Sequence, residues 1–331
     1  MYHSRFKGNH YNAGYKYGAL LKTHNKKLDS CPTFPIDSKR IEFAKKCIPL
    51  YKENYPEILE EIEGIVDGNE TNREFLLTML LSMYCYDVDN KCSCFAFVNE
   101  DNIIFGRNSD FLVSLEKLYT NVIYKLDNVY SFTGNTTALV EIEDGINEYG
   151  LSVGLTFIAS HTVKPGLNSG MLVRYLLEKC RTVDECIDSL KKLPIATAQT
   201  LTIADSDGKI VVIECNCDEI NIINNDTNVF ATNIFMSEKM KKYNIINFDN
   251  WRALERYETI KNAFDSKEMY SLDFAKNILS GEYGFICQYD RKTNADTVWS
   301  VIYDIKNKKI YRVEGNPSRK RFIEDIRFKF K

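Results

Sequence analysis

Apolar side chains recur at helical spacing through the first ninety residues, and from Cys92 onward the pattern changes to short runs that are typical of strands. The early part predicts helices over 11–28, 41–65 and 75–86. Later helices are expected at 170–193, with a capping signal at Thr182 inside the stretch, and at 250–264 and 271–279. The predicted strands cover 92–98, 103–109, 119–125, 138–143, 151–158, 199–205, 210–215, 219–224, 228–232, 297–304 and 309–314. This order of elements favours antiparallel sheets with helices on their outer faces, a layered α+β sandwich.

Two of these predicted strands face one another across a polar turn. Residues 99–102 (NEDN) separate an apolar run that begins at Cys92 from one that ends with Arg107 and Asp110. Such a turn predicts a β-hairpin, and antiparallel pairing makes the start of the first strand a neighbour of the end of the second. A thiol, a cation and a carboxylate are therefore expected together. This combination activates a nucleophilic sulfur, because the cation favours the thiolate and the carboxylate orients a base.

The composition of the 331 residues narrows the function classes. Apolar residues make up 44%, enough for a substantial core, and the net charge of −3 provides no basic field for nucleic acid. The first residues lack an apolar signal region, and no run approaches the ~18 apolar residues of a membrane span. Ten cysteines without a secretion signal favour a reducing compartment. We therefore expect a cytoplasmic protein that has neither nucleic acid nor a membrane as its partner.

Short segments along nearly the whole chain match one enzyme group in the right order. Besides the hairpin, they are 14–18 (GYKYG), 144–154 (DGINEYGLSVG), 172–177 (LVRYLL), 232–233 (TN), 253–257 (ALERY) and 297–304 (TVWSVIYD). Together they resemble the N-terminal-nucleophile linear amide hydrolases. The closing segments are most similar to the acyl-coenzyme A:6-aminopenicillanic acid acyltransferase branch, which is related to the choloylglycine hydrolases.

The resemblance implies a four-layer αββα sandwich of the N-terminal-nucleophile hydrolase type. Residues 1–91 would form a helical pro-segment and 92–331 the catalytic part, the two fragments staying associated after cleavage between Lys91 and Cys92. Cys92 would then be the nucleophile, and its own α-amine, with an ordinary pKa near ~8, could take the thiol proton. The four histidines lie outside any motif, which fits a base other than imidazole. Cys94 is expected on the same side of the strand as Cys92 and is interpreted as a packing residue.

The resemblance also assigns the remaining site residues. Arg107 is expected beside the sulfur and Asp110 at the α-amine, while Asn233 would donate an N–H to the oxyanion. Arg256 matches the family's arginine, whereas Arg252, one helical turn earlier, is expected to be solvated. Two positions depart from the family pattern: Thr156 stands where the bile-salt branch has an oxyanion asparagine, and Lys91 stands where the fungal acyltransferase has glycine.

The predicted function is an autoprocessed cysteine amidohydrolase that cleaves a linear amide through a thioester acyl-enzyme. An alternative is an acyltransferase that moves an acyl group from a thioester or amide to an amine. A third possibility is an unprocessed, non-catalytic binding protein of the same fold. The substrate would be a small acyl amide or acyl thioester, with no cofactor and no metal. A zinc site built from the pairs Cys92/Cys94 and Cys215/Cys217 is a weaker alternative, because knuckles usually have two to four residues between ligands.

Overall fold

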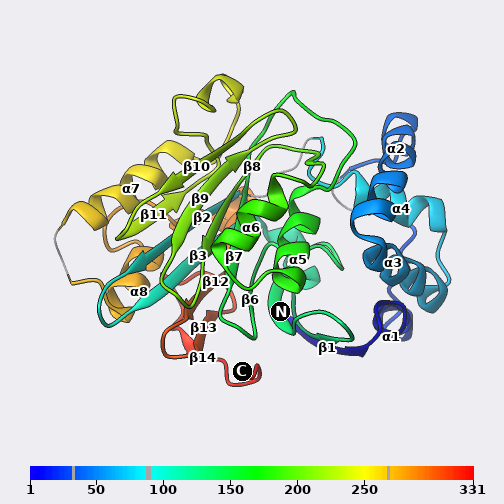
Figure 1. Ribbon diagram of the computed structural model, residues 1–331, viewed down its shortest axis with the longest axis horizontal. Helices are drawn as coiled ribbons and strands as arrows, with labels where there is room; N and C mark the ends of the chain where they lie inside the picture. The colour runs from blue at the N-terminus through cyan, green and yellow to red at the C-terminus, as the bar shows by residue number, and fades with distance from the viewer. Residues whose placement is uncertain (32–33, 87–90, 267–268) are drawn as a thin grey trace.

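Two β-sheets lie face to face in the computed structural model, and helices cover the outer face of each (Figure 1). The structure describes residues 1–31, 34–86, 91–266 and 269–331. Contacts between β2 and the strands β7, β8 and β9 join the two sheets, so that the inner faces share one apolar layer. The predicted four-layer αββα sandwich is confirmed.

The larger sheet has eight strands in the order β1-β4-β5-β6-β7-β8-β9-β10. All neighbours pair antiparallel except β1 and β4, which are parallel. The strands are β1 (Tyr2–Gly8), β4 (Thr120–Leu126), β5 (Phe132–Thr136), β6 (Asp144–Asn147), β7 (Ser152–Phe157), β8 (Gln199–Ala204), β9 (Ile210–Cys215) and β10 (Ile220–Asn224). The segment before Cys92 therefore contributes a strand to this sheet.

The smaller sheet carries the predicted hairpin near one edge. Its six strands are antiparallel in the order β11-β2-β3-β12-β13-β14. They are β2 (Lys91–Val98), β3 (Ile103–Leu112), β11 (Asn228–Ala231), β12 (Ala295–Asp304), β13 (Lys309–Val313) and β14 (Ile323–Glu324). Because β2 starts at Lys91, the bond between Lys91 and Cys92 lies inside a hydrogen-bonded strand.

Helices form the two outer layers. The larger sheet is covered by α5 (Ser169–Lys179) and α6 (Val183–Leu190), and the smaller by α7 (Ala253–Asp265) and α8 (Leu272–Ser280) (Figure 1). The first helices stand beside α5 and share the core of the larger sheet. They are α1 (His10–Thr23), α2 (Ser38–Asn54), α3 (Pro56–Asn69) and α4 (Arg73–Leu81).

Helices α1 and α3 cross at very short range because both present glycines to the contact. A methyl group added at Gly14 would lie 1.9 Å from the carbonyl oxygen of Glu61, and one added at Gly64 would lie 2.1 Å from that of Tyr11. Only a hydrogen atom fits at either position. The crossing brings the side chain of Glu61 toward α5.

A buried ion network joins the first ninety residues to α5. Arg174 donates to Glu61 at 2.8 Å and to Glu178 at 2.6 Å, while Tyr55 donates to Glu178 at 2.6 Å. The ring of His10 lies 3.2 Å from the same carboxylate. Burial opposes ionisation of Glu178, but Arg174, His10 and Tyr55 prevail and lower its pKa to about 2. The carboxylate therefore stays charged and holds the two parts together.

Most predicted elements are found, with differences at particular sites. Thr182 caps α6 and divides the expected helix 170–193 in two, and Pro56 divides the expected helix 41–65. The predicted strand 138–143 is wrong: Leu139 adopts a left-handed φ of 56°, so the backbone turns there. The strands β1, β5 and β14 are not among the predicted strands.

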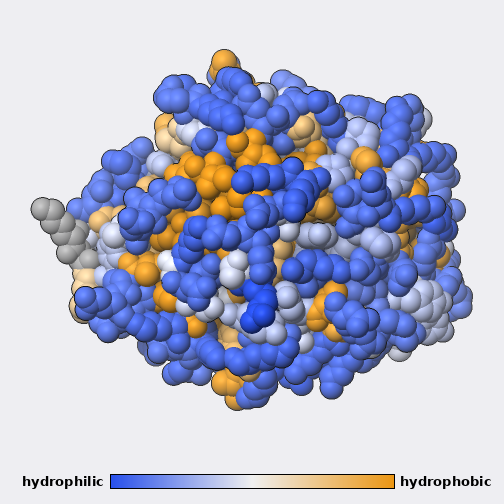
Figure 2. All heavy atoms as spheres, viewed as in Figure 1, coloured by the Kyte–Doolittle hydropathy of each residue, from blue (hydrophilic) through white to orange (hydrophobic). Residues whose placement is uncertain are grey.

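The surface is hydrophilic over most of the face in Figure 2, with a hydrophobic area in the upper centre of the view, over β9 and β10. Among the described residues, no helix is both long enough and apolar enough to cross a membrane.

Candidate active site

The β2–β3 hairpin places the predicted residues by its register. Cys92 pairs with Ser109, Lys91 with Asp110, and Cys94 with Arg107. Cross-strand partners share a face of the sheet. Cys92 and Arg107 therefore point toward the larger sheet, while Asp110 points toward α7 and α8. The Cys92 thiol and the Asp110 carboxylate therefore lie at the same end of the hairpin, but on opposite faces of the sheet.

Arg107 is buried between the sheets and contacts the sulfur directly. Its Nη2 donates to Cys92 Sγ at 2.7 Å, and its Nη1 donates to Asp144 at 2.8 Å. A second carboxylate, Glu143, lies 3.3 Å from Nη2. Burial alone would lower the pKa of Arg107, but these anionic neighbours raise it above its usual value. The guanidinium is therefore a fixed positive charge beside the thiol.

Close packing of the sheets at this point depends on Gly154 in β7. A methyl group there would lie 3.1 Å from Arg107 Cδ and 3.2 Å from Cys94 Sγ. The absence of a side chain leaves room for the arginine to reach across the sandwich. Its Nε donates to the backbone carbonyl of Leu155 in the same strand at 3.2 Å.

The Cys92 thiol is fully buried, with 0% of the residue exposed. Burial raises the pKa of the thiol above its usual value, although Arg107 acts in the opposite direction. In the intact chain burial thus favours the neutral thiol, and the thiol lies next to a cation that would stabilise its anion.

The backbone of Cys92 is held by two further predicted residues. Its amide N–H donates to Asn233 Oδ1 at 2.7 Å, and its carbonyl accepts from Arg256 Nη1 at 2.6 Å. Arg256 Nη2 also donates to Asn233 Oδ1 at 3.0 Å. Asn233 Nδ2 donates to the carbonyl of Phe157 at 2.8 Å, which uses one of its two hydrogens.

Asp110 lies on the other face with Arg256, at an N–O distance of 3.7 Å. Thr297 donates to its carboxylate at 2.6 Å and Tyr289 at 3.1 Å. Burial raises the pKa of Asp110 to about 6, although Arg256 and the two hydroxyl donors favour the ionised form. Arg252, by contrast, is half-exposed, in line with the expectation of a solvated side chain, and it pairs with Glu255.

Sequence reasoning missed the acidic residues that hold Arg107. Asp144 accepts from Arg107, from Trp299 at 2.9 Å and from Tyr303 at 2.7 Å. Asp144 is the first residue of the segment 144–154, so the motif included this residue but did not show that Arg107 is its partner. Thr156 donates to the carbonyl of Thr232 at 2.9 Å, so its hydroxyl hydrogen is used within the protein.

The family comparison adds to this geometry. Residues 98–319 match the profile of the family described as "Acyl-coenzyme A:6-aminopenicillanic acid acyl-transferase". The chain belongs to this family. It is therefore an enzyme that acts on amide bonds as a hydrolase or an acyltransferase. No curated protein matches the chain in a sequence search.

Several solved structures are also similar to this chain, at low sequence identity. Penicillin V acylase from Agrobacterium tumefaciens is 15% identical over 67% of this chain and 83% of that one, with a TM-score of 0.44. Two mutants of conjugated bile acid hydrolase from Clostridium perfringens are each 13% identical. They cover 67% of this chain and 89% of theirs, with TM-scores of 0.41 and 0.48.

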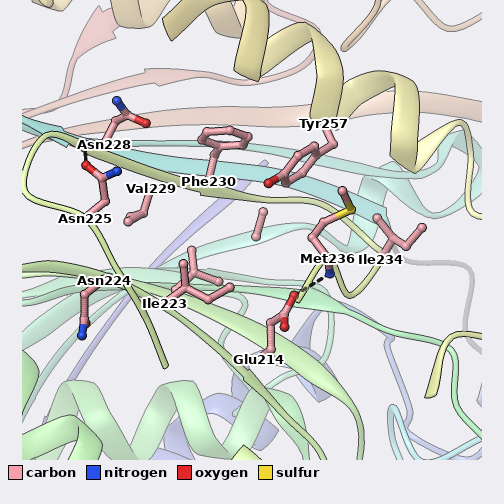
Figure 3. A pocket seen from close by; sticks show the side chains of 12 residues that line it. Glu214, Ile223, Asn224, Asn225, Asn228, Val229, Phe230, Ile234, Met236 and Tyr257 are labelled. Carbon is pink, nitrogen blue, oxygen red and sulfur yellow. Dashed lines mark hydrogen bonds between the residues drawn. The ribbon is translucent and has the colours of Figure 1, made fainter. Parts of the chain in front are cut away.

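A pocket of about 200 Å³ opens beside the site of this acyltransferase-family enzyme. Figure 3 shows Glu214 and Ile223 of the larger sheet on one wall, with Phe230 and Tyr257 on the other. Ile234, directly after Asn233, also lines it. Cys92 is not among the described residues that line this pocket, and its thiol is enclosed in the intact chain because none of the residue is exposed.

The alternative zinc site finds no support in the described part of the chain, where no three His, Cys, Asp or Glu residues are grouped so that they could hold a metal ion. Cys215 instead accepts from Gln199 at 2.9 Å.

Proposed function

We propose that the chain is a cysteine amidohydrolase that processes itself between Lys91 and Cys92 and then uses Cys92 as an N-terminal nucleophile. The contact that carries the proposal is the 2.7 Å approach of Arg107 Nη2 to Cys92 Sγ. It is reinforced by the hold of Asn233 on the backbone nitrogen of the same residue. The atom to be activated and the nitrogen to be released are thus both positioned by polar side chains.

Self-cleavage is proposed as an acyl shift followed by hydrolysis. The Cys92 thiol adds to the Lys91 carbonyl carbon, the C–N bond breaks, and the thiol proton ends on the nitrogen. The products are a thioester between the Lys91 carbonyl and Sγ and a primary amine on Cys92. Water then hydrolyses the thioester, leaving a carboxylic acid on Lys91 and restoring the thiol.

The same groups serve the substrate reaction. The Cys92 α-amine takes the thiol proton, and the thiolate beside Arg107 adds to the substrate carbonyl carbon. The second hydrogen of Asn233 Nδ2 stabilises the oxyanion. As the substrate C–N bond breaks, the Cys92 ammonium returns the proton to the leaving nitrogen. Water then hydrolyses the thioester, releasing the acid and restoring the thiol; if an amine attacks instead, the enzyme is an acyltransferase.

Arg256 and Asp110 are proposed to position the nucleophilic residue. Arg256 fixes its carbonyl, and the Asp110 carboxylate, neutralised in part by Arg256, favours the ammonium form of the α-amine electrostatically. We also propose a reducing, cytoplasmic location, because all ten cysteines are thiols rather than disulfides in this structure.

The test is intact-mass analysis of the purified wild-type protein together with an acyl-amide hydrolysis assay. We expect fragments of residues 1–91 and 92–331 that co-elute on gel filtration, because Arg174 and Glu178 bind groups from the first fragment and β1 pairs with β4. An intact chain that hydrolyses amides would contradict the N-terminal-amine mechanism. An intact, inactive chain would favour the non-catalytic binding protein.

Replacing Asn233 with alanine is expected to lower kcat by ~10²–10³, because one oxyanion donor is removed. The measurement is kcat on the purified, processed variant, with its melting temperature as a check on folding. Asn228→Ala is the matched control, since Asn228 lies on the strand that leads to Asn233 but bonds Tyr270 and Thr227 instead. Equal turnover in the two variants would reduce Asn233 to a turn residue.

A further inference from the structure

The side chain of Lys91, directly before the proposed cleavage point, is buried, and two aromatic rings lie near its ammonium group. Only 1% of the residue is exposed, although lysine is rarely fully buried. Its Nζ lies 5.1 Å from the ring centre of Phe248 and 5.8 Å from that of Trp251. Both distances are within the range in which an aromatic face attracts a cation. We call Phe248 and Trp251 the aromatic pair.

The backbone that carries the aromatic pair is held in a costly conformation. Trp251 and Arg252 have φ angles of 51° and 60°, in the left-handed region that side-chain-bearing residues rarely adopt. Such residues cost of order 1–3 kcal/mol each and persist where the surroundings impose them. Here Arg256 holds this segment: it donates to the carbonyls of Asn250 and Trp251 at 3.0 Å each.

The aromatic pair is therefore tied to the groups around Cys92. The arginine that fixes the Cys92 carbonyl also fixes the loop that presents Trp251. The ring of Trp251 packs edge-on against Tyr289, with centres 5.6 Å apart, and the Tyr289 hydroxyl donates to Asp110. These hydrogen bonds and this ring packing would not be needed if the aromatic pair contacted Lys91 only by chance.

We propose that the aromatic pair is the acyl subsite of the enzyme and that it takes an acyl group whose side chain ends in a cation, such as a lysyl group. This inference rests on the proposed function. In self-cleavage the acyl group that moves onto Cys92 Sγ is that of Lys91, so the first acyl group the site handles is lysyl. Once the bond is cut, the Lys91 end withdraws and a substrate side chain of the same chemistry takes its place.

The charges nearby are compatible with a cation in this place. Arg256 is matched by Asp110 at 3.7 Å, so it does not leave an unbalanced positive charge beside the rings. Arg252 turns away and stacks over Phe285 at 3.6 Å. The competing possibility is an apolar acyl chain, because the methylene stem of a lysine also packs against rings. A substrate with an uncharged side chain of the same length as lysine distinguishes the cationic from the apolar acyl group.

The first experiment compares the processed wild-type enzyme on Nα-acetyl-lysine p-nitroanilide and on Nα-acetyl-norleucine p-nitroanilide. We expect kcat/KM to be roughly 10- to 30-fold higher for the lysyl amide, the effect of a desolvated cation on an aromatic face. Trp251→Leu should bring that ratio close to one. Tyr2→Leu is the control: Tyr2 also lies under a lysine, at 4.5 Å, but on the exposed strand β1, and the ratio should not change.

A second experiment measures binding without catalysis. In Lys91→Gly and Lys91→Ala, n-butylammonium should raise the melting temperature more than n-butanol does, and adding Trp251→Leu should remove the difference. Equal effects of the two compounds, or a norleucyl amide that is cleaved as well as the lysyl amide, would overturn the cation subsite. If neither amide is cleaved while butylammonium is still preferred, the proposed function fails for these amides and the cation site stands.

Discussion

Replacing Cys92 with alanine is expected to leave one full-length chain and to abolish amide hydrolysis, with a fall in kcat of at least about 10⁵-fold. The size of the effect follows from the double role of the residue. In the proposed mechanism its thiol is the attacking group in both self-cleavage and substrate hydrolysis, and without cleavage the α-amine proposed as the base would never form. The measurements are the intact mass of the purified variant and its activity on any amide that the wild-type enzyme cleaves.

Cys94→Ala is the matched control for this prediction. Cys94 lies two residues further along β2, on the same face, and is equally buried. Burial raises the pKa of its thiol, with Arg107 opposing, as at Cys92, but it pairs across the hairpin with Arg107 rather than standing at the proposed cut. We expect normal processing and activity in this variant. A Cys92→Ala protein that is still cleaved, or a Cys94→Ala protein that is not cleaved, would contradict the assignment of Cys92 as the nucleophile.

Arg107→Met should be damaging in two separate ways. Glu143 and Asp144 would be left buried without their cation, and removal of one partner from a buried ion pair typically costs about 3–5 kcal/mol of unfolding free energy. The thiolate would also lose the charge that stabilises it, so kcat/KM should fall sharply. Urea unfolding and steady-state kinetics measure the two effects independently.

Two further variants serve as comparisons for the effects of Arg107→Met. Arg107→Lys keeps the charge but loses the planar fork that spans the sulfur and Asp144, so it should recover part of the stability and little of the rate. Arg73→Met removes an arginine from an exposed pair with Glu63 and should cost less than about 1 kcal/mol. Wild-type rates in both Arg107 variants would exclude this arginine from the active site.

The hairpin could be predicted because local signals agreed at every position. A polar turn separates two apolar runs, and the pairing that results brings Cys92 within reach of Arg107. The structure also brings Asp110, Asn233 and Arg256 to the same place, while their chemical roles stay predictions.

The parts that could not be predicted depend on contacts distant in sequence. The strand β1 is polar, with Phe6 as its one buried residue, and its partner β4 lies more than a hundred residues further on. In 138–143, Val140 and Ile142 are buried as core residues of a turning segment, which an apolar run alone does not distinguish from a strand. Likewise, nothing in the local sequence shows that Asp144 accepts from Arg107.

The position of Lys91 within β2 indicates that the proposed self-cleavage would follow folding. The proposed cut falls in a strand whose partner β3 meets it through the hairpin and whose other partner, β11, comes from more than a hundred residues later. Asn233 and Arg256, which hold Cys92, arrive from that later part as well. In the proposed mechanism, a nascent or misfolded chain therefore lacks the arrangement that holds Cys92 for cleavage. The cleaved fraction of a preparation would count the molecules that have reached the native fold, so a gel lane would serve as a folding assay for any variant that keeps the Cys92 thiol.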